Sequence, residues 1–504
     1  MRHPDYPSPA PHPPRRHDGV SELVELFARV QRDHPHRVVL PAALPARGLS
    51  ARQVWADASD VAAVLARAGV GAGSLVAVST GNDPSTFAAW LACRLCDAAM
   101  IPIERSASAT ERADICAAFG PAVSLERLAD TDRGEAVGGL RVLPFDIPDQ
   151  ARGDYPGAAV LKLTSGTSGR PKATFTTEAQ ALADARHIIE GMGIAPDDVQ
   201  IGAIPLSHSY GIGNLVLPLL MQGTGLVLRN SFVPHQVADD ARTFGARIFC
   251  GVPFMFEHFV THPPSGGWPE TLRWLVSAGA PLDTRTKTQF RQAFDTMIHS
   301  FYGTSETGGI SFDASDDQST EATVGRPLPG VSITLRPVES DDHEVGRVHV
   351  ESAAVATGYA GLGVAGEFRG AFLTEDLGRF NRSGHLVLTG RLSGFINVAG
   401  RKVQPDEVEQ VLRAMPGVAD ALVVGVDDRE RGQHLVACLV PSGAPPTLFG
   451  VRRHCAQSLA PHKVPRNVIM LDALPLTVRG KPDREALRRI AAGRASSDGK
   501  SDVT

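Results

Sequence analysis

A short apolar run followed by a polar, glycine-containing segment is the feature that most constrains this chain. Residues 158–163 are mostly apolar and predict a β-strand. The next nine residues, TSGTSGRPK at positions 164–172, hold four hydroxyls, two glycines and two cations. Glycines let backbone N–H groups approach an anion closely, hydroxyls add donors, and Arg170 and Lys172 add positive charge. The segment therefore indicates a polyphosphate-binding loop after a strand, rather than a flexible Ser/Gly surface loop. It is not a Walker A loop, because Gly169 is followed by Arg-Pro-Lys.

The remaining pattern predicts an α/β fold. A strand at 75–79, a helix at 87–100 and a strand at 100–103 follow one another with short connections. Such a strand–helix–strand unit implies a parallel sheet with helices on its faces. From about residue 325 the strands become short and are separated by Gly, Asp and Asn, which predicts a smaller β subdomain. The last part of the chain predicts a compact α+β unit.

A chain of 504 residues exceeds what one hydrophobic core usually serves. We expect a large N-terminal domain at 21–390, made of parallel-sheet α/β subdomains plus the small β subdomain. A hinge at 391–393 and a small, mobile C-terminal domain at 394–491 follow. The terminal segments 1–20 and 492–504 are polar and are expected to be disordered tails.

Composition excludes several function classes. The net charge of −5 and the pI near 6.4 give no indication of a nucleic-acid partner or an anionic membrane surface. No run approaches the roughly 18 apolar residues of a membrane span, and the N-terminus lacks the apolar region of a signal peptide. Cys93 and Cys96 form a C-x-x-C without a second pair at zinc spacing, so buried thiols are expected. This cysteine usage fits a reduced, cytoplasmic setting.

Five motifs, in order, resemble those of the adenylate-forming superfamily, which contains acyl- and aryl-CoA synthetases, peptide-synthetase adenylation domains and luciferases. The resemblance spans about residues 21–490 and is greatest to AMP-forming acyl-CoA synthetases. It implies that the first motif is the loop that contacts the ATP phosphates. The residues implied there are Thr164, Ser165, Gly166, Thr167, Ser168, Gly169 and Lys172.

The second motif, at 302–306, resembles the superfamily's Y-G-x-T-E. It implies that Tyr302 stacks on adenine and that Glu306 holds the Mg²⁺ that bridges the ATP phosphates. The implied nucleotide contacts include Tyr302, Gly303, Thr304 and Ser305. A preceding segment resembles the one that lines the adenine with backbone atoms. It comprises Gly279, Ala280 and Pro281.

The third motif, at 374–378, resembles T-G-D-x-G, in which the aspartate accepts hydrogen bonds from both ribose hydroxyls. Asp376 keeps that position, while Glu375 replaces the usual glycine. In the fourth motif, Arg391 is implied to contact the nucleotide. Ser393 and Gly394 replace the charged residues usual at the superfamily's hinge.

Four further residues complete the implied site. Gly400 matches the glycine past which the pantetheine arm enters, and the resemblance places Lys402 among the cofactor-binding residues. Lys481, in the fifth motif P-x-T-x-x-G-K, is the implied catalytic lysine, which offsets repulsion between the acid and the α-phosphate. His208 occupies the place of a residue that gates the acyl pocket, although a loop histidine without a special role is an equal alternative.

The resemblance implies an acid–thiol ligase that uses ATP and Mg²⁺. A carboxylic acid forms acyl-AMP and pyrophosphate, the C-terminal domain rotates, and the acyl group passes to CoA. The alternatives are transfer to a carrier-protein phosphopantetheine and, from another class, a non-catalytic nucleotide- or acyl-binding protein. Apolar residues at 252–256 favour a fatty or aryl acid over an amino acid.

Overall fold

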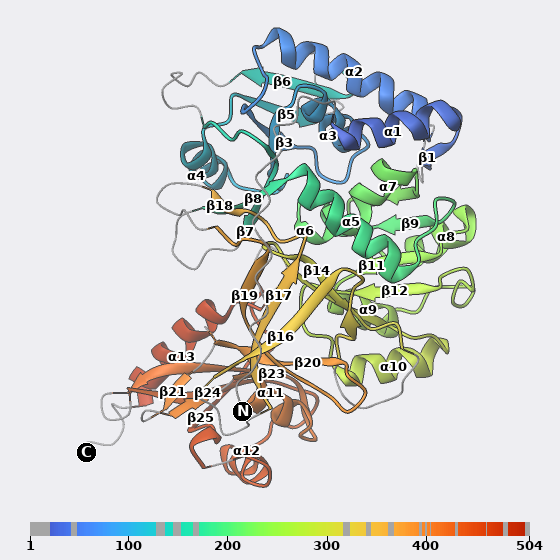
Figure 1. Cartoon of the computed structure of the whole chain (residues 1–504). Coiled ribbons are helices and arrows are strands. Elements are labelled where there is room, and N and C mark those ends of the chain that lie inside the picture. Colours follow the sequence, from blue (N-terminus) through green and yellow to red (C-terminus); the bar gives the residue numbers. More distant parts are fainter. Residues whose placement is uncertain are drawn as a thin grey trace, which may run out of the picture. The chain divides into compact units, whose positions relative to one another are not determined.

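The structure, a computed structural model, divides into two compact units by its internal contacts (Figure 1). Unit 1 comprises residues 1–185, 194–231 and 356–367, and unit 2 comprises 186–193, 232–355 and 368–504. The residues described are 21–41, 48–127, 137–144, 153–164, 171–315, 323–338, 344–360, 367–392, 396–398, 401–403, 405–428, 432–459, 461–476 and 482–498. Each unit is presented by itself. The predicted boundaries at 390 and 394 remain a prediction.

A seven-stranded sheet organises unit 1, in the order β18-β8-β7-β4-β3-β5-β6. Its strands are β3 (Leu75–Ser79), β4 (Ala99–Pro102), β5 (Val123–Arg127), β6 (Leu140–Pro144), β7 (Ala158–Thr164), β8 (Lys172–Thr177) and β18 (Gly358–Ala360). The central four, β7, β4, β3 and β5, are parallel, whereas the flanking strands are antiparallel. β3 and β4 are buried along their whole length, as expected for parallel strands covered on both faces.

Helices and smaller strands complete unit 1. They are α1 (Glu22–Asp33), α2 (Ala51–Arg67), α3 (Ser85–Leu95), α4 (Ala109–Phe119), α6 (Ser209–Gly211), a π-helix at Ile212–Val216, α7 (Leu217–Gln222), β1 (Val38–Leu40), β2 (Leu49–Ser50), β9 (Val199–Gly202) and β10 (Gly225–Leu228). Helix α5 (Glu178–Met192) begins in unit 1 and continues into unit 2. Ser50 and Ser108 start α2 and α4 with capping boxes that satisfy first-turn N–H groups.

One helix is shorter than its sequence predicts. The apolar run at 87–100 predicts a single helix, but α3 ends at Leu95 and β4 starts at Ala99. Asp97 takes a left-handed φ of 53°, which a helix cannot continue through. The Arg94 guanidinium donates to Ala98 O at 2.9 Å and to Asp97 Oδ1 at 3.0 Å, and so holds the turn.

Unit 2 begins with a second set of parallel strands. β11 (Ile248–Gly251), β12 (Trp274–Ser277) and β13 (His299–Thr304) pair in parallel, and β14 (Gly308–Phe312) and β15 (Arg326–Pro327) follow antiparallel. The helices are α8 (Pro234–Phe244), α9 (Pro253–Thr261) and α10 (Thr284–Phe294). Phe259 packs edge-to-face on Phe232 and Phe249, with ring centroids 5.1 and 5.7 Å apart.

The short strands expected after residue 325 form a four-stranded antiparallel sheet. Its order is β16 (Val331–Pro337), β17 (Gly346–Ser352), β19 (Ala371–Phe380) and β20 (Leu386–Arg391). Its apolar face shares a core with the β13–β14 hairpin, in which Val348, Leu386 and Tyr302 are buried. The predicted β subdomain is therefore confirmed.

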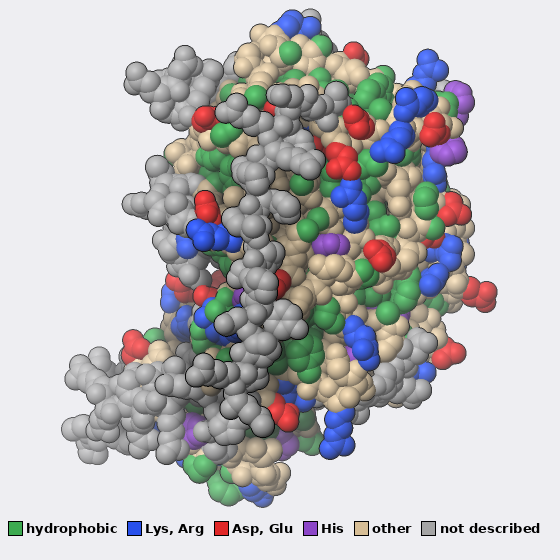
Figure 2. All heavy atoms as spheres, in the orientation of Figure 1, with side chains coloured by type: hydrophobic (Ala, Val, Ile, Leu, Met, Phe, Trp, Pro, Cys, Tyr) green, Lys and Arg blue, Asp and Glu red, His purple; other side chains and the backbone are tan. Residues whose placement is uncertain are grey.

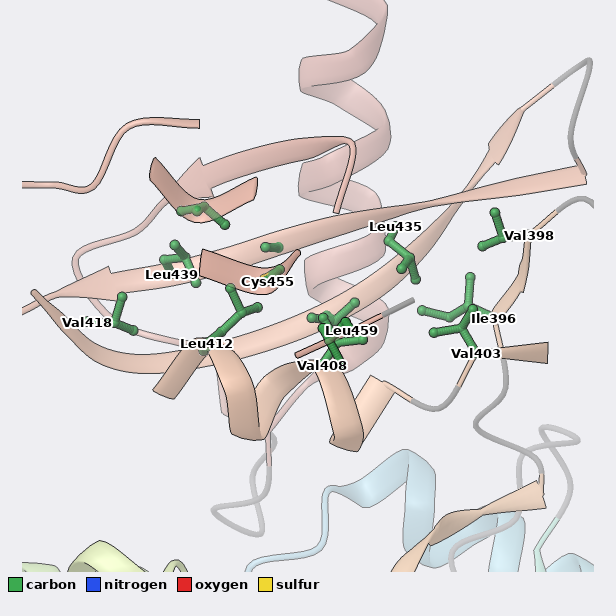
Figure 3. Packing of buried hydrophobic residues seen from close by; sticks show 14 residues of the cluster. Ile396, Val398, Val403, Val408, Leu412, Val418, Leu435, Leu439, Cys455 and Leu459 are labelled. Atoms are coloured by element: carbon green, nitrogen blue, oxygen red, sulfur yellow. The ribbon is translucent and has the colours of Figure 1, made fainter. Parts of the chain in front are cut away.

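The end of the chain is an α+β arrangement, as predicted. It contains β21 (Ile396–Val398), β22 (Arg401–Val403), β23 (Val418–Asp428), β24 (Gly432–Pro441), β25 (Asn467–Met470), α11 (Pro405–Arg413), α12 (Leu448–Cys455) and α13 (Arg484–Asp498). Figure 3 shows Val408 and Leu412 of α11 pointing at Leu435 and Leu439 of β24, with Cys455 of α12 beside them. All five side chains are buried.

Helix α13 corrects the predicted C-terminal tail. The polar composition after residue 492 predicts disorder, but the helix continues to Asp498. Ala491, Ala492 and Arg494 are strong helix formers, which favours continuation even though few apolar residues remain. Residues 499–504 and the predicted N-terminal tail at 1–20 lie outside the described residues.

The cysteines agree only in part with the expectation of buried thiols, because Cys93 is buried whereas Cys96 is partly exposed. On the face shown in Figure 2, acidic and basic side chains are interspersed over the described surface. All six cysteines are free thiols. Burial raises the pKa of Cys93 to about 12, so this thiol stays protonated and unreactive at neutral pH. Among the described residues, none of the helices has the length and apolar character needed to cross a bilayer.

Leu412→Ala tests the C-terminal core. Leu412 is fully buried in α11, so losing its side chain should lower the free energy of unfolding by about 2–5 kcal/mol. Leu448→Ala is the matched control, because Leu448 is 43% exposed and its loss should cost little. Denaturant titration followed by circular dichroism measures both. Equal effects of the two substitutions would contradict this packing.

Candidate functional site

The predicted phosphate loop connects two antiparallel strands of unit 1. Thr164 ends β7 and Lys172 starts β8, and the two residues are direct partners in the register. The Thr164 hydroxyl donates to Lys172 O at 3.5 Å, and Lys172 Nζ lies 6.0 Å from the centre of the Tyr359 ring. The hairpin therefore brings Thr164 and Lys172 together. The loop residues Ser165, Gly166, Thr167, Ser168 and Gly169 lie outside the described residues.

His208 has a carboxylate partner that the sequence did not reveal. His208 Nε2 lies 3.3 Å from Glu104 Oε2, and both side chains are partly exposed. Glu104 follows β4 and His208 precedes α6. The two residues are 104 positions apart in the sequence. No sequence pattern links them, which is why only the folded chain shows this pair.

Asn82 fixes the loop that carries His208. Its side-chain amide donates to Ile204 O at 2.9 Å and to Arg229 O at 2.8 Å, while its Oδ1 accepts from Leu206 N at 3.0 Å. One amide thus satisfies three backbone groups from two segments. Asn82 stands in a Gly-Asn-Asp-Pro sequence, which is typical of a turn but does not indicate these long-range contacts.

In unit 2, Asp376 is the centre of a hydrogen-bonded cluster. Asp376 of β19 pairs in register with Arg391 of β20, and Arg391 Nε lies 2.8 Å from Asp376 Oδ1. The Tyr302 hydroxyl donates to Asp376 Oδ2 at 2.6 Å. The structure therefore unites three predicted residues from three motifs around one buried carboxylate.

Backbone alternation separates Asp376 from its unusual neighbour. Thr374 and Asp376 are buried, whereas Glu375 is exposed, as expected when successive strand residues face opposite sides. The Thr374 hydroxyl donates to Val348 O at 2.9 Å and accepts from Asp376 N at 3.1 Å. Glu375 therefore adds its charge on the face opposite to the Asp376 carboxylate.

Tyr302 is held as a hydrogen-bond donor. Burial, followed by the charge of Asp376, raises the pKa of the Tyr302 hydroxyl well above its ordinary value. The hydroxyl stays protonated at neutral and mildly alkaline pH, so it can donate to Asp376 throughout that range. Only 8% of Tyr302 is exposed, and its hydroxyl is bound to Asp376. Stacking of its ring on adenine remains a prediction.

Glu306 lies in the tight turn between β13 and β14. Gly303 and Thr304 end β13, and Ser305 and Glu306 form the turn; the Glu306 side chain is half-buried. A Cβ on Gly303 would come within 2.6 Å of Gly308 O, so only glycine allows the hairpin strands to approach this closely. The Thr304 and Thr307 hydroxyls are 3.1 Å apart.

The segment expected to line adenine follows β12. Gly279, Ala280 and Pro281 are exposed, and Gly279 has a left-handed φ of 83° that favours glycine. A Cβ at Gly279 would lie 3.7 Å from Val252 Cγ1. These small residues therefore leave open surface beside the start of α9.

Several predicted residues are placed only in part or not at all. Lys402 lies in β22, where its backbone pairs with Asn397 of β21. Gly400, Lys481 and the hinge residues Ser393 and Gly394 lie outside the described residues. On the described side of Lys481, Asp483 N donates to Pro475 O at 2.8 Å.

The donor set fits a magnesium ion that arrives with phosphate. Within the described residues, no group of three or more His, Cys, Asp or Glu side chains could hold a metal. Mg²⁺ typically takes one or two protein carboxylates, with phosphate oxygens and water as its other ligands. A single turn carboxylate such as Glu306 matches this mode.

Sequence comparison decides the family. Residues 27–360 match the AMP-binding enzyme family, and residues 407–481 match the AMP-binding enzyme C-terminal domain. The chain belongs to the AMP-binding enzyme family. The family membership that the motifs predicted is therefore confirmed.

Curated relatives of this AMP-binding enzyme are acid–CoA ligases. The 2-succinylbenzoate–CoA ligase of Enterococcus faecalis is 29% identical over 66% of this chain and 69% of its own length. A salicylyl-CoA synthase / salicylate adenylyltransferase of a Streptomyces species is 30% identical over 75% of this chain and 72% of its own. The family and these relatives support the predicted activity, that of an ATP-dependent, AMP-forming acid–CoA ligase.

Solved structures confirm the fold. The ATP-bound crystal structure of MatB from Rhodopseudomonas palustris superposes with a TM-score of 0.81, at 24% identity, over 93% of this chain and 99% of MatB. The predicted fold class, with a large α/β part followed by a small C-terminal domain, is therefore shown for this AMP-binding enzyme.

Tyr302→Phe tests the carboxylate cluster, because it removes only the hydroxyl that donates to Asp376. The bond exists with and without ATP, so its loss weakens ATP binding only by leaving the Asp376 carboxylate less well oriented. The contribution of about 1.5–3 kcal/mol of a hydrogen bond to a charged group sets the upper limit, so ATP should bind more weakly, by at most about a hundredfold. If Asp376 holds the ribose, 2′-deoxy-ATP should lose less affinity than ATP. Calorimetric titration of both nucleotides measures this.

The matched control is Tyr155→Phe. The Tyr155 hydroxyl donates to Phe119 O at 3.0 Å in unit 1, so its removal should not alter the ratio of ATP to 2′-deoxy-ATP affinity. A Tyr302→Phe enzyme with unchanged affinity for both nucleotides would contradict a role for this hydroxyl at the ribose site.

Proposed function

We propose that this AMP-binding enzyme joins an aromatic carboxylic acid to CoA through an enzyme-bound acyl-adenylate. The observation that carries the proposal is the buried Asp376 carboxylate with its two donors, Tyr302 and Arg391, at the position of the superfamily's ribose-binding aspartate. A buried carboxylate held by two donors keeps its acceptor oxygens oriented. Each oxygen has a further lone pair that a ribose hydroxyl can use.

In the first half-reaction, an oxygen of the substrate carboxylate attacks the α-phosphorus of ATP. The bond from the α-phosphorus to the bridging oxygen breaks, and pyrophosphate leaves. Thr164, Lys172 and the loop residues between them bind the departing phosphates through hydroxyls, backbone N–H groups and charge. Glu306 would hold Mg²⁺, which would supply positive charge to offset that of these phosphates.

Lys481 is proposed to act at this step. Two anions, the carboxylate and the α-phosphate, must approach each other, and an ammonium between them lowers the electrostatic barrier. Lys481 stands three residues before Arg484, the first residue of α13, whose guanidinium is bound to the buried Glu409 at 2.6 Å. The C-terminal domain is then proposed to rotate at Ser393. This rotation withdraws Lys481 and allows the second half-reaction to follow.

In the second half-reaction, the CoA thiol loses its proton and its sulfur attacks the acyl carbon. The bond from that carbon to the AMP oxygen breaks, and AMP leaves. His208, held by Glu104 at 3.3 Å, is proposed to gate the acyl pocket, and Gly400 allows the pantetheine arm to pass. Lys402 and the adenine-lining residues Gly279, Ala280 and Pro281 are proposed to contact the cofactors.

An aromatic acid is favoured by the apolar surface at the start of α9. Phe254 is 48% exposed and packs edge-to-face on Phe232, with centroids 6.2 Å apart. Val252 lies beside Gly279 in the same unit. The similar enzymes named for 2-succinylbenzoate and salicylate also act on ring-containing acids. A fatty acid is the alternative that this surface also permits.

CoA is the proposed acceptor because the relatives are named as CoA ligases. Transfer to a carrier-protein phosphopantetheine is the alternative for the same chemistry. The free thiols agree with a cytoplasmic location, which remains a proposal.

The test is pyrophosphate release with ATP and Mg²⁺ across a panel of aryl, fatty and amino acids, with CoA, with holo-carrier protein, or with neither. We expect aryl acids to trigger release and CoA to accelerate turnover. Acceleration by carrier protein alone would exclude CoA. No release with any acid, despite measurable ATP binding, would favour a non-catalytic nucleotide-binding protein.

Lys481→Ala should slow adenylate formation by about 10²–10³-fold, as expected for losing one positive group at the reacting phosphate. Thioester formation from supplied acyl-AMP should be preserved, since Lys481 acts only before that step. Quenched-flow measurement of each half-reaction separates the two. Lys463→Ala, which removes a lysine paired with Glu407 at 2.8 Å, is the control and should leave both rates near the wild-type values. Wild-type adenylation by the Lys481→Ala enzyme would remove Lys481 from the mechanism.

A further inference from the structure

The start of helix α13 is held by a buried carboxylate on helix α11. Glu409 of α11 is only 2% exposed. Its Oε1 accepts from Arg484 Nη1 at 2.6 Å, and its Oε2 accepts from Arg484 Nη2 at 3.1 Å. Two parallel bonds fix the plane of the guanidinium as well as its distance, because the arginine fork matches a carboxylate. The first residue of α13 is therefore oriented by α11.

The same ion pair closes around the edge of the C-terminal sheet. β23 is the end strand in the order β22-β21-β24-β23, so one of its sides faces no further strand of the described sheet. Glu409 Oε1 accepts from Val423 N at 2.8 Å, and Arg484 Nη1 donates to Val423 O at 3.0 Å. Both backbone groups are thus satisfied by the ion pair, as buried backbone groups require. The pair therefore ties α11, β23 and α13 together.

Helices α11 and α13 cover opposite faces of this sheet. Leu412 of α11 packs in one apolar core with Val423, whereas Leu487 of α13 packs in a second core with Val424. Successive residues of a strand face opposite sides, so the two helices belong to separate cores. The ion pair around the edge of β23 is a polar link between the two layers.

The chain that leads into α13 is also held. The Asp483 carboxylate caps the first turn of the helix and accepts from Ala486 N at 2.9 Å. Asp483 N donates to Pro475 O at 2.8 Å, and Leu476 and Pro482 form an antiparallel bridge. Residues 475–476 and 482–483 are therefore paired, and we call this pairing the stem. It leads directly into α13.

Stability alone does not account for the buried pair. Glu409 Oε2 also accepts from Arg413 Nη2 at 3.2 Å, and Arg484 Nη2 donates to Asp406 Oδ1 at 3.2 Å. These contacts supply the carboxylate with several donors, but the cost of removing a buried ion pair from water often offsets its attraction. What the pair provides is one defined geometry for the segment that it holds.

We propose that Glu409 and Arg484 are positioning residues for Lys481. Lys481 is bonded directly to Pro482 and stands three residues before Arg484. Contacts that fix Pro482 therefore also restrain the backbone from which the Lys481 side chain extends. A group that stabilises charge at a reacting phosphate must be held within about 0.5 Å of its productive place. This inference rests on the proposed role of Lys481 in adenylate formation.

The test uses Glu409→Gln in the full-length enzyme. The amide has the shape of the carboxylate but one acceptor oxygen and no charge, so it cannot hold the arginine fork. Adenylate formation at saturating ATP and acid should slow by about ten- to a hundredfold, as expected for a displacement of about 1 Å. Thioester formation from supplied acyl-AMP should stay near the wild-type rate, which also shows that the variant is folded. Quenched flow measures each half-reaction.

A double-mutant cycle separates positioning from an independent structural effect. In a Lys481→Ala enzyme, adding Glu409→Gln should slow adenylation by less than about twofold, because the ammonium that Glu409 helps to place is already absent. A full additional loss in the double variant would show that Glu409 acts without Lys481 and would overturn the inference. Wild-type adenylation by Lys481→Ala alone would instead remove the proposed role of Lys481, and the inference with it.

Arg413→Gln is the matched control. Arg413 donates to Glu409 and to Asp420 Oδ1 in the same cluster, whereas the stem and Arg484 keep their contacts in this variant. It should lower the melting temperature but leave adenylation within about twofold of the wild-type rate. Equal slowing by Arg413→Gln and Glu409→Gln would trace the effect to lost stability of the domain and contradict a positioning role.

Arg484→Lys decides the case in which Glu409→Gln does not fold. Lysine keeps the positive charge but replaces the planar fork with a point charge. Adenylation should slow by about tenfold or more while thioester formation from acyl-AMP is preserved. Wild-type rates of both half-reactions in Arg484→Lys would rule out positioning through this pair.

Discussion

Parallel pairing of β3 with β4 and β5, and of β4 with β7, is the constraint on which unit 1 depends. Parallel strands cannot be joined by hairpins, so each needs a crossover connection that places helices over the sheet. The same pairing brings every carboxyl end to one edge. The ends of β7, β4, β3 and β5 therefore gather Thr164, Glu104, Ser79 and Arg127 along a single line, although their sequence positions are far apart.

In unit 2, the arrangement of the strands around the site depends on one buried charge, the Asp376 carboxylate. Asp376 would be costly to bury alone, and Tyr302 and Arg391 offset that cost with a hydrogen bond and an ion pair. Each partner comes from another strand of the unit, β13 or β20. The requirement to satisfy one carboxylate therefore couples the β13–β14 hairpin, which carries Glu306, to the antiparallel β subdomain.

Sequence reasoning succeeded where a local pattern has one physical solution. The strand at residues 75–79 was predicted with the observed bounds because the apolar run and its flanking breakers agree there. It failed at α3, where a continuous apolar run hid the left-handed turn at Asp97, and at α13, where polar composition was taken for disorder. In both cases composition over a window of residues missed a local backbone preference. The unexpected features of the site, Glu104 beside His208 and the Asn82 bridge, depend on contacts between distant segments.

The sequence by itself determined the family, because each motif is a short segment recognised by its residue types and spacing. It also named the polar groups that are proposed for nucleotide chemistry. It also determined the fold class, since alternating strands and helices imply a parallel sheet. Only the tertiary structure decided that Tyr302 serves Asp376 through its hydroxyl, that Glu375 faces the opposite side of β19, and that Glu409 and Arg484 meet at the edge of β23. These properties depend on strand register and on which neighbours satisfy each polar atom, and long-range packing sets both.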